Sequence, residues 1–227
     1  GLGCRQALGK CLGLKGRPVP IFGKTNRAWC KQVFAPGPVC GRLWVKYLIW
    51  ELRSSHFPIE EGVRRAAPVG KASSSILGGR LLLTADGFEN PELRQVFLGI
   101  AGKPASELTV LFVPTAALTP EQRHNVQLSQ AELHDLGIRA QNLRVLELNR
   151  PVSPDEAVGK DLIYVCGGDT LHLLTQARAV GFDRLLAAHL SRGGLYVGVS
   201  AGSILVGPVV RGQAGLGLVD CVILPHY

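Results

Sequence analysis

The chain has 227 residues, 46% of them hydrophobic, enough to bury the core of one sizeable α/β domain. Its net charge of +8 arises in the first third, because residues 1–78 hold 13 Lys and Arg against 3 acids whereas residues 79–227 hold 12 against 14. No apolar run approaches the roughly 20 residues that cross a bilayer, so we expect a soluble, cytoplasmic protein with no membrane partner.

Residues 1–78 are predicted to form an irregular, basic extension in front of a domain at 79–227. Gly and Pro recur there without a period, and a short helix or strand over Arg42–Leu52 is the one element expected. The four cysteines of this segment are separated by 6, 18 and 9 residues, which matches no zinc pattern. Because no nucleic-acid-binding module accompanies the positive charge, we expect neither a metal nor a nucleic-acid partner.

Apolar strands alternate with helices from residue 80 on. The expected strands are Arg80–Ala85, Leu108–Val113, Leu143–Leu148, Leu162–Cys166 and Leu195–Val199. The expected helices are Pro91–Gly102, Pro120–Leu136, Thr170–Ala179 and Leu185–Leu190. Asn90 and Thr119 stand before the prolines that open the first two helices, as N-caps commonly do. This alternation predicts an α/β fold with a doubly wound, mostly parallel sheet that is covered on both faces.

Three turns are expected to meet at one edge of this sheet, because sites in parallel sheets lie at the carboxyl ends of the strands. They are Asp86-Gly87, Gly167-Gly168-Asp169 and the turn that holds Ser200.

The turn at Ser200 has the sequence Gly198-Val199-Ser200-Ala201-Gly202. A strand, then G-x-S-x-G, then a helix predicts a nucleophile elbow, in which a tight turn exposes the serine at the end of the sheet. Backbone N–H groups there can stabilise an oxyanion, and those of Gly168 and Ala201 are the candidate donors. An ordinary Gly/Ser turn is the alternative interpretation of these five residues by themselves.

A serine nucleophile needs a base, and His226 is the candidate. It follows the strand-like run Val222–Pro225, which predicts a place at another strand tip, and its order after the serine suits a hydrolase triad. The other histidines beyond residue 78 fall on predicted helices, where a solvent-facing or structural role is usual; they are His124, His134, His172 and His189.

Three segments together resemble the peptidase E family of serine peptidases, peptidase family S51. They are Leu162–Thr170 with its Gly-Gly-Asp-Thr, the elbow Gly198–Ser203, and Leu224-Pro225-His226-Tyr227. Leu81–Phe88 is similar to the start of that domain, so the resemblance covers about residues 80–227.

The resemblance implies a class I glutamine-amidotransferase-like fold with Ser200 as nucleophile, His226 as general base, and Gly168 and Ala201 as oxyanion donors. Members of the family remove an N-terminal aspartate from dipeptides or cut β-aspartyl-arginine units, without a metal or another cofactor. We therefore expect a serine-type exopeptidase that hydrolyses short peptides, dipeptides with N-terminal aspartate above all, through an acyl-enzyme. Its expected partner is a small peptide substrate.

The interval between Ser200 and His226 departs from the family pattern. The carboxylate that orients the histidine in the family would lie near Pro208–Gln213, which holds no acid, and Asp220 is the only carboxylate in the interval. The chain lacks methionine and stops one residue after His226, so we expect a fragment without the last elements of the domain. A catalytically impaired protein, or a binding protein without the triad acid, is therefore the alternative function.

Two further enzyme classes fit the elbow less well. An α/β-hydrolase esterase shares G-x-S-x-G, but no HGGG-type oxyanion motif precedes Ser200. A glutamine amidotransferase would need cysteine where this chain has serine.

Overall fold

A computed structural model describes residues 21–23, 26–29, 47–51, 78–219 and 222–225. Its main sheet holds five parallel strands, which pair in the order β4 (Arg80–Thr84), β8 (Leu195–Val199), β7 (Leu162–Val165), β5 (Val110–Val113) and β6 (Leu143–Val145). This confirms the predicted α/β fold with a mostly parallel sheet. The strand order places the carboxyl ends of β4, β8 and β7 side by side, at the edge where the three turns were expected to meet.

Three antiparallel strands extend this sheet beyond β4. They are β1 (Ile21–Gly23), β2 (Asn26–Trp29) and β3 (Tyr47–Glu51), and β3 pairs with the whole length of β4. β3 lies inside the range predicted for a short element. The sheet therefore continues across position 78, and a domain boundary at that position stays a prediction.

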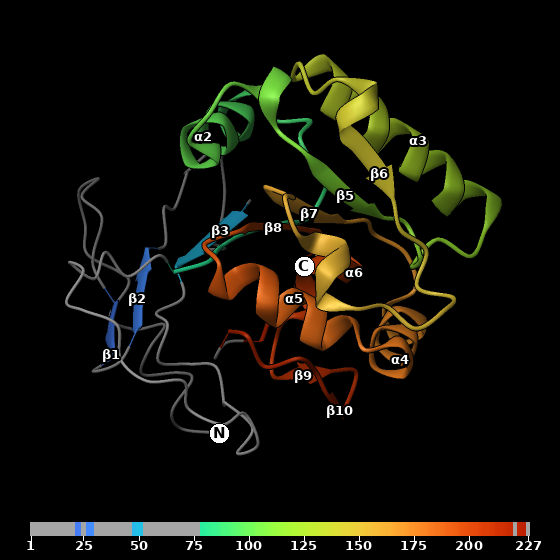
Figure 1. The fold of residues 1–227 in the computed structure, drawn as a ribbon. Helices are drawn as coiled ribbons and strands as arrows, with labels where there is room; N and C mark the ends of the chain where they lie inside the picture. The colour runs from blue at the N-terminus through green and yellow to red at the C-terminus, as the bar shows by residue number, and fades with distance from the viewer. Residues whose placement is uncertain (1–20, 24–25, 30–46, 52–77, 220–221, 226–227) are drawn as a thin grey trace, which may run out of the picture.

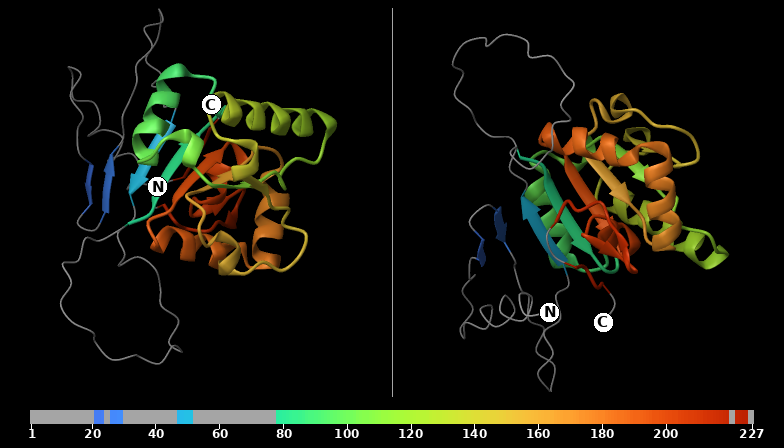
Figure 2. Two further views of the ribbon diagram at one scale, coloured as in Figure 1. Left: turned by 45° about the horizontal axis from the view of Figure 1, so that its top comes forward. Right: turned by 90° about the horizontal axis from the view of Figure 1, so that it is seen from below.

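Helices cover both faces of the parallel strands, as Figures 1 and 2 show. One face packs against α2 (Pro91–Ala101) and α3 (Pro120–Asp135), and the other against α4 (Thr170–Val180) and α5 (Phe182–Ser191). Successive strand residues point to opposite faces, so Leu81 and Leu83 join one buried cluster while Leu82 joins the other. This two-sided burial explains why the strands are continuous apolar runs.

The predicted N-caps hold the starts of α2 and α3. The side chain of Asn90 accepts the backbone N–H of Glu92 at 2.9 Å. Thr119 and Gln122 form a capping box, in which each side chain accepts the other residue's backbone N–H. α2 ends at Ala101 and is capped by Gly102, whose φ of 76° is the left-handed conformation that glycine adopts without strain.

Two predicted strands differ in the structure. β6 ends at Val145 rather than Leu148, because β5, with which it pairs, ends at Val113 and the last bond joins the Leu146 N–H to the Phe112 carbonyl. The run Val222–Pro225 forms no strand. Val222 and Leu224 are exposed while Ile223 packs on the core, which is the alternation of a strand, but no strand of the described residues pairs with it.

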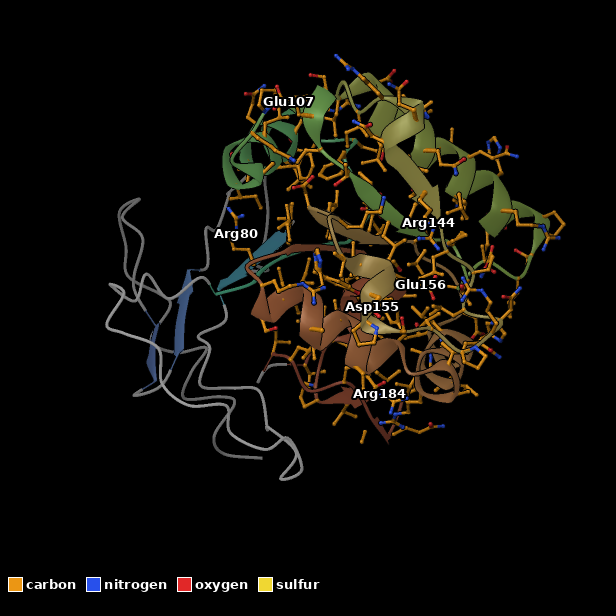
Figure 3. The ribbon with its side chains drawn as sticks, viewed as in Figure 1. Arg80, Glu107, Arg144, Asp155, Glu156 and Arg184 are labelled. Carbon is orange, nitrogen blue, oxygen red and sulfur yellow. The ribbon has the colours of Figure 1, made fainter. Side chains whose placement is uncertain are left out.

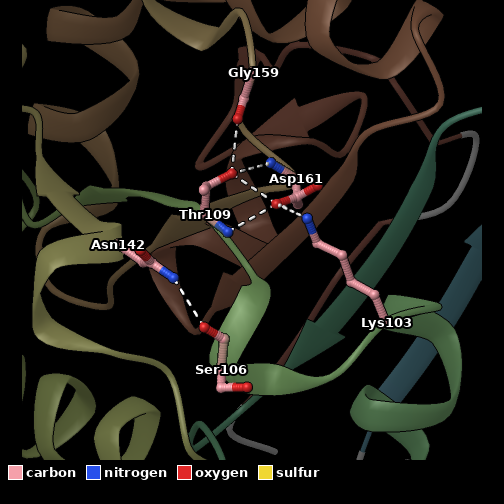
Figure 4. A network of polar contacts seen from close by, with 6 residues as sticks. All are labelled: Lys103, Ser106, Thr109, Asn142, Gly159 and Asp161. Carbon is pink, nitrogen blue, oxygen red and sulfur yellow. Dashed lines mark hydrogen bonds and ion pairs between the residues drawn. The ribbon is translucent and has the colours of Figure 1, made fainter.

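The amino ends of β5 and β7 are joined by a polar network around Asp161, shown in Figure 4. Its carboxylate accepts the backbone N–H of Thr109 and the ammonium of Lys103, each at 2.7 Å. Burial would raise the pKa of Asp161, but the bonds from Lys103 and Thr109 outweigh it and lower that pKa below its usual value. The network lies at the end of the sheet opposite to the Ser200 turn and fixes the strands there.

Charged side chains occur on strands, helices and short turns alike, as the labelled residues of Figure 3 illustrate. Glu156, for example, joins Arg144 at 2.9 Å and Arg150 at 2.7 Å. Within the described part of the chain, no helix is both long enough and apolar enough to span a membrane.

Candidate active site

Ser200 stands between β8 and the short helix α6 (Ala201–Leu205) in a strained backbone conformation. Its φ of 46° and ψ of −102° lie outside the regions that residues with a side chain normally occupy. Its N–H donates to the Thr84 carbonyl at 2.9 Å, and its own carbonyl accepts from Ile204 at 3.0 Å. Hydrogen bonds to β4 and to α6 therefore hold the turn in the elbow form that the sequence predicted.

The two glycines of the motif are required by close packing. A methyl group built on Gly198 would lie 2.7 Å from the carbonyl of Gly202, and one built on Gly202 would lie 2.5 Å from the carbonyl oxygen of Val165. Both distances are shorter than any real contact of such a carbon. The absence of a side chain at Gly202 lets the serine turn lie close to β7, and its absence at Gly198 lets β8 lie close to the start of α6.

Ser203 locks the elbow to the end of β4. Its hydroxyl accepts the N–H of Thr84 at 3.0 Å and is directed at the carbonyls of Thr84 and Gly198, at 2.8 and 2.6 Å. Tyr196, which lies in β8, adds a second bond to the start of α6, because its hydroxyl donates to the Gly202 carbonyl at 2.7 Å. These bonds, all buried, fix the backbone on both sides of Ser200.

Gly167 and Gly168 let the loop after β7 pack closely, Gly167 against the serine turn and Gly168 against Ala116. The φ of Gly168 is 144°, and a methyl group there would lie 2.1 Å from the carbonyl oxygen of Ala116, which instead accepts the Asp169 N–H at 2.7 Å. A methyl group on the preceding Gly167 would lie 3.3 Å from Cβ of Ser200. No acceptor within the described residues takes the N–H of Gly168 or of Ala201. As far as the described residues go, both N–H groups are thus available to an oxyanion.

A pocket of about 230 Å³ opens beside Ser200. The polar residues and glycines that line it come from the loop after β4, from one face of α3 and from the ends of β7 and β8; they are Asp86, Glu89, Gln122, Asn125, Ser129, Glu132, Gly167, Gly168 and Ser200. Two of the predicted turns, at Asp86 and at Gly167-Gly168, therefore do meet Ser200. Asp169 does not line the pocket, because its side chain caps α4 by accepting the His172 N–H at 2.7 Å.

The contribution of α3 was not predicted from the sequence. Gln122, Asn125, Ser129 and Glu132 recur at intervals of three or four residues, which places them on one face of the helix. That spacing was the available signal. A polar helix face is usually solvated, so only the packing of α3 over the strand ends turns it into a pocket wall.

The pocket is acidic. It is lined by the carboxylates Asp86, Glu89 and Glu132, and by no Lys, Arg or His among the described residues. Glu132 is half-buried, and this burial raises the pKa of its carboxyl. Its Oε2 accepts the N–H of Phe88 at 3.0 Å, which opposes part of that rise. Cys166 also lines the pocket, and its burial raises the pKa of the thiol well above the usual value.

His226, the predicted base, and Asp220 lie outside the described residues. The histidines on the helices were expected to be solvent-facing or structural. His189 is buried in α5, where its Nε2 donates to the Leu195 carbonyl at 3.0 Å, and His134 bonds the Ile138 carbonyl through Nδ1 at 2.9 Å. Neither these two nor His124 and His172 line the pocket.

Across residues 78–219 and 222–225, no three potential ligands converge on a point where a metal ion could sit.

Comparison with known proteins gives consistent matches. The family model for peptidase family S51 matches residues 81–227. An uncharacterised peptidase of Listeria monocytogenes is 30% identical, over 52% of this chain and 65% of that protein. Peptidase E of Salmonella arizonae is 32% identical, over 52% of this chain and 55% of that protein. This chain thus spans between half and two thirds of the length of these two relatives.

One solved structure supports the fold assignment. The crystal structure of a candidate peptidase E protein from Listeria monocytogenes superposes with a TM-score of 0.56 at 27% identity. The match covers 66% of this chain and 80% of that one.

Proposed function

The chain belongs to peptidase family S51, and from this premise we propose that it is a serine-type exopeptidase that hydrolyses short peptides, in particular dipeptides with an N-terminal aspartate. The observation that carries the proposal is the strained φ of 46° at Ser200, held by buried hydrogen bonds at the edge of a pocket. Such strain persists where the surrounding structure enforces it, and it is typical of functional sites.

The proposed chemistry is acyl transfer. The Ser200 oxygen attacks the carbonyl carbon of the peptide bond while its proton passes to His226. The N–H groups of Gly168 and Ala201 stabilise the oxyanion of the tetrahedral intermediate. The C–N bond then breaks, and the leaving amine takes the proton from His226. Water repeats the sequence on the acyl-enzyme, which releases the acid and restores the Ser200 hydroxyl.

A fluorophosphonate probe tests the nucleophile. We expect covalent labelling of Ser200, loss of labelling in Ser200→Ala, and retention of labelling in Ser203→Ala if that variant stays folded. Hydrolysis of Asp-X dipeptides should disappear in Ser200→Ala. Turnover that survives this substitution would overturn the proposal.

A binding protein without turnover is the second candidate. The observation in its favour is that Asp220 is the only carboxylate between Ser200 and His226. In a known serine protease, disabling the triad aspartate lowers kcat by about 10⁴. This function predicts that dipeptides raise the melting temperature of the full chain while no amine product is released.

A further inference from the structure

We propose that Thr84 is a positioning residue for the reaction at Ser200, because its hydroxyl fixes the pocket loop, residues 85–89, to the turn that holds the nucleophile. The inference rests on the proposed function for the reaction concerned. It adds to that function a residue that does not itself line the pocket. Thr84 would act by setting where a bound peptide lies relative to the Ser200 oxygen.

The main chain of Thr84 is bonded to the elbow. Thr84 is the last residue of β4, is 3% exposed, and pairs with Val199, the residue before Ser200. Its carbonyl accepts the Ser200 N–H at 2.9 Å, and its N–H donates to the Ser203 hydroxyl at 3.0 Å. Both bonds use only backbone groups of Thr84, so they do not depend on its side chain.

The hydroxyl of Thr84 joins the pocket loop to the same turn. Its Oγ1 accepts the N–H of Gly87 at 3.2 Å, a bond that closes the bend at Ala85 and Asp86. Threonine and serine hydroxyls commonly replace a backbone acceptor in such tight turns. The same hydroxyl is directed at the Gly198 carbonyl of β8, at 3.4 Å. One side chain therefore connects the start of the loop with the strand that leads into the elbow.

The loop held in this way forms one wall of the pocket. The loop residues that line the pocket together with Ser200 are Ala85, Asp86 and Glu89. Farther along the loop, the N–H of Phe88 donates to Glu132 of α3 at 3.0 Å, and its carbonyl accepts Nε of Arg94 of α2 at 2.7 Å. These bonds fix the loop to the two helices, whereas the Thr84 hydroxyl fixes it to the elbow.

The position of this wall matters for acyl transfer. The carbonyl carbon under attack must lie about 3–3.5 Å from the nucleophile, and a misplacement of about 1 Å can lower the rate about 100-fold. Without the Thr84 hydroxyl, the buried N–H of Gly87 would lose its acceptor, and the loop would shift to satisfy it. A peptide in the pocket would then lie at a different distance from Ser200, although the elbow keeps its own bonds.

Thr109 provides the comparison that separates positioning from a purely structural role. It lies at the opposite end of the sheet, in the network of Figure 4, and outside the pocket. Its Oγ1 also accepts a backbone N–H at 3.2 Å, that of Asp161, and it donates to the Gly159 carbonyl at 2.7 Å. Valine in place of either threonine keeps the shape of the side chain and removes such bonds. Both substitutions should therefore lower the melting temperature, but only the one at Thr84 should affect the reaction.

The test measures dipeptide hydrolysis, fluorophosphonate labelling and melting temperature on the full chain. We expect kcat/KM for Asp-Leu to fall about tenfold or more in Thr84→Val. The labelling rate of Ser200 should change little, because the probe reacts without being held by the loop and the elbow bonds remain. Thr84→Ser keeps the hydroxyl and should restore hydrolysis. Thr109→Val should hydrolyse Asp-Leu like the unmodified chain.

The outcomes separate this inference from the proposed function. An unmodified chain that is neither labelled nor active on dipeptides would overturn the proposed function, and this inference with it. A labelled, active chain in which Thr84→Val loses no more kcat/KM than Thr109→Val, or in which Thr84→Ser does not restore hydrolysis, would overturn this inference alone. If Thr84→Val does not fold, Thr84→Cys, whose thiol is a weaker acceptor than the serine hydroxyl, must show the loss relative to Thr84→Ser.

Discussion

Ser200 adopts a backbone conformation that its neighbours enforce. The hydrogen bonds of its own N–H and carbonyl, and those of Ser203, hold a φ of 46° that an L-residue seldom adopts. Such strain is of order 1–3 kcal/mol. Glycine has no Cβ and tolerates positive φ, so it would relieve this strain.

We therefore predict that Ser200→Gly is more stable than Ser200→Ala by about 1 kcal/mol. Both substitutions remove the hydroxyl, so the difference in stability between the two variants measures the strain of the backbone alone. Urea unfolding of the two variants measures it. An alanine variant as stable as the glycine variant would show that Ser200 is not strained.

Glu132 gives a second prediction at this scale, through the pH dependence of stability. Its pKa is raised in the folded protein, so the folded state holds the proton more tightly than the unfolded state does. Its contribution is favourable below the ordinary value of 4.5 and is lost as pH rises through the folded pKa. Glu132→Gln should then raise the free energy of unfolding at pH 7 and have little effect at pH 4. Chemical unfolding at both values checks this, and a destabilised variant at pH 7 would contradict it.

Replacing glycine by alanine is expected to raise the stability of the protein in one helix and to lower it in another. Gly99 lies in α2 with open space around its Cα, so an added methyl group meets nothing within 4 Å. Gly202 lies in α6 against β7, where the same methyl group would be 2.5 Å from the Val165 carbonyl oxygen. Helix propensity favours alanine at both positions, and packing opposes it at one.

We expect Gly99→Ala to stabilise the protein by about 0.5–1 kcal/mol, the helix-propensity difference between the residues. Gly202→Ala should destabilise it by about 1–3 kcal/mol, as overpacking of a core does. Thermal unfolding of both variants provides the measurement. Equal effects of the two substitutions would mean that α6 does not pack against β7 as described.

At this scale the sequence predicted the helices well and the edges of the sheet poorly. N-caps such as Asn90 and Thr119 act within a few residues, so the local sequence contains their signal. The end of β6 depends on where β5 ends, and Val222–Pro225 lacks a pairing strand among the described residues despite its alternating pattern. Strand pairing is a long-range property that a single segment does not encode.

The stability of the whole fold rests on two clusters of buried hydrophobic side chains, one on each face of the sheet. His189 is 1% exposed and links α5 to β8 through the Leu195 carbonyl. Burial lowers the pKa of this imidazole, and the bond to Leu195 opposes only part of the effect. The folded state therefore favours the neutral ring.

Acid should weaken the whole fold through His189. Because its folded pKa is lowered, its contribution to stability is full above the ordinary value of 6.5 and is lost as pH falls below it toward the folded pKa. We expect the free energy of unfolding to fall as the pH drops from about 7.5 to about 5.5, and His189→Gln, which keeps an N–H donor, to flatten this decline. Denaturant unfolding across this pH range tests it; an unchanged slope in the variant would assign the decline to other groups.

The sequence by itself determined the α/β alternation, the helix starts and the elbow at Ser200, because each depends on periodicity or on contacts between near neighbours. Only the tertiary structure decided that α3 forms the pocket wall and that Glu132 lies near Ser200, 68 positions later in the sequence. The helix face presented to the strand ends is set by how Leu133 and its neighbours pack on the sheet. That packing joins residues distant in sequence, so the spacing of the polar residues along α3 indicates that they share a face but not what this face lies against.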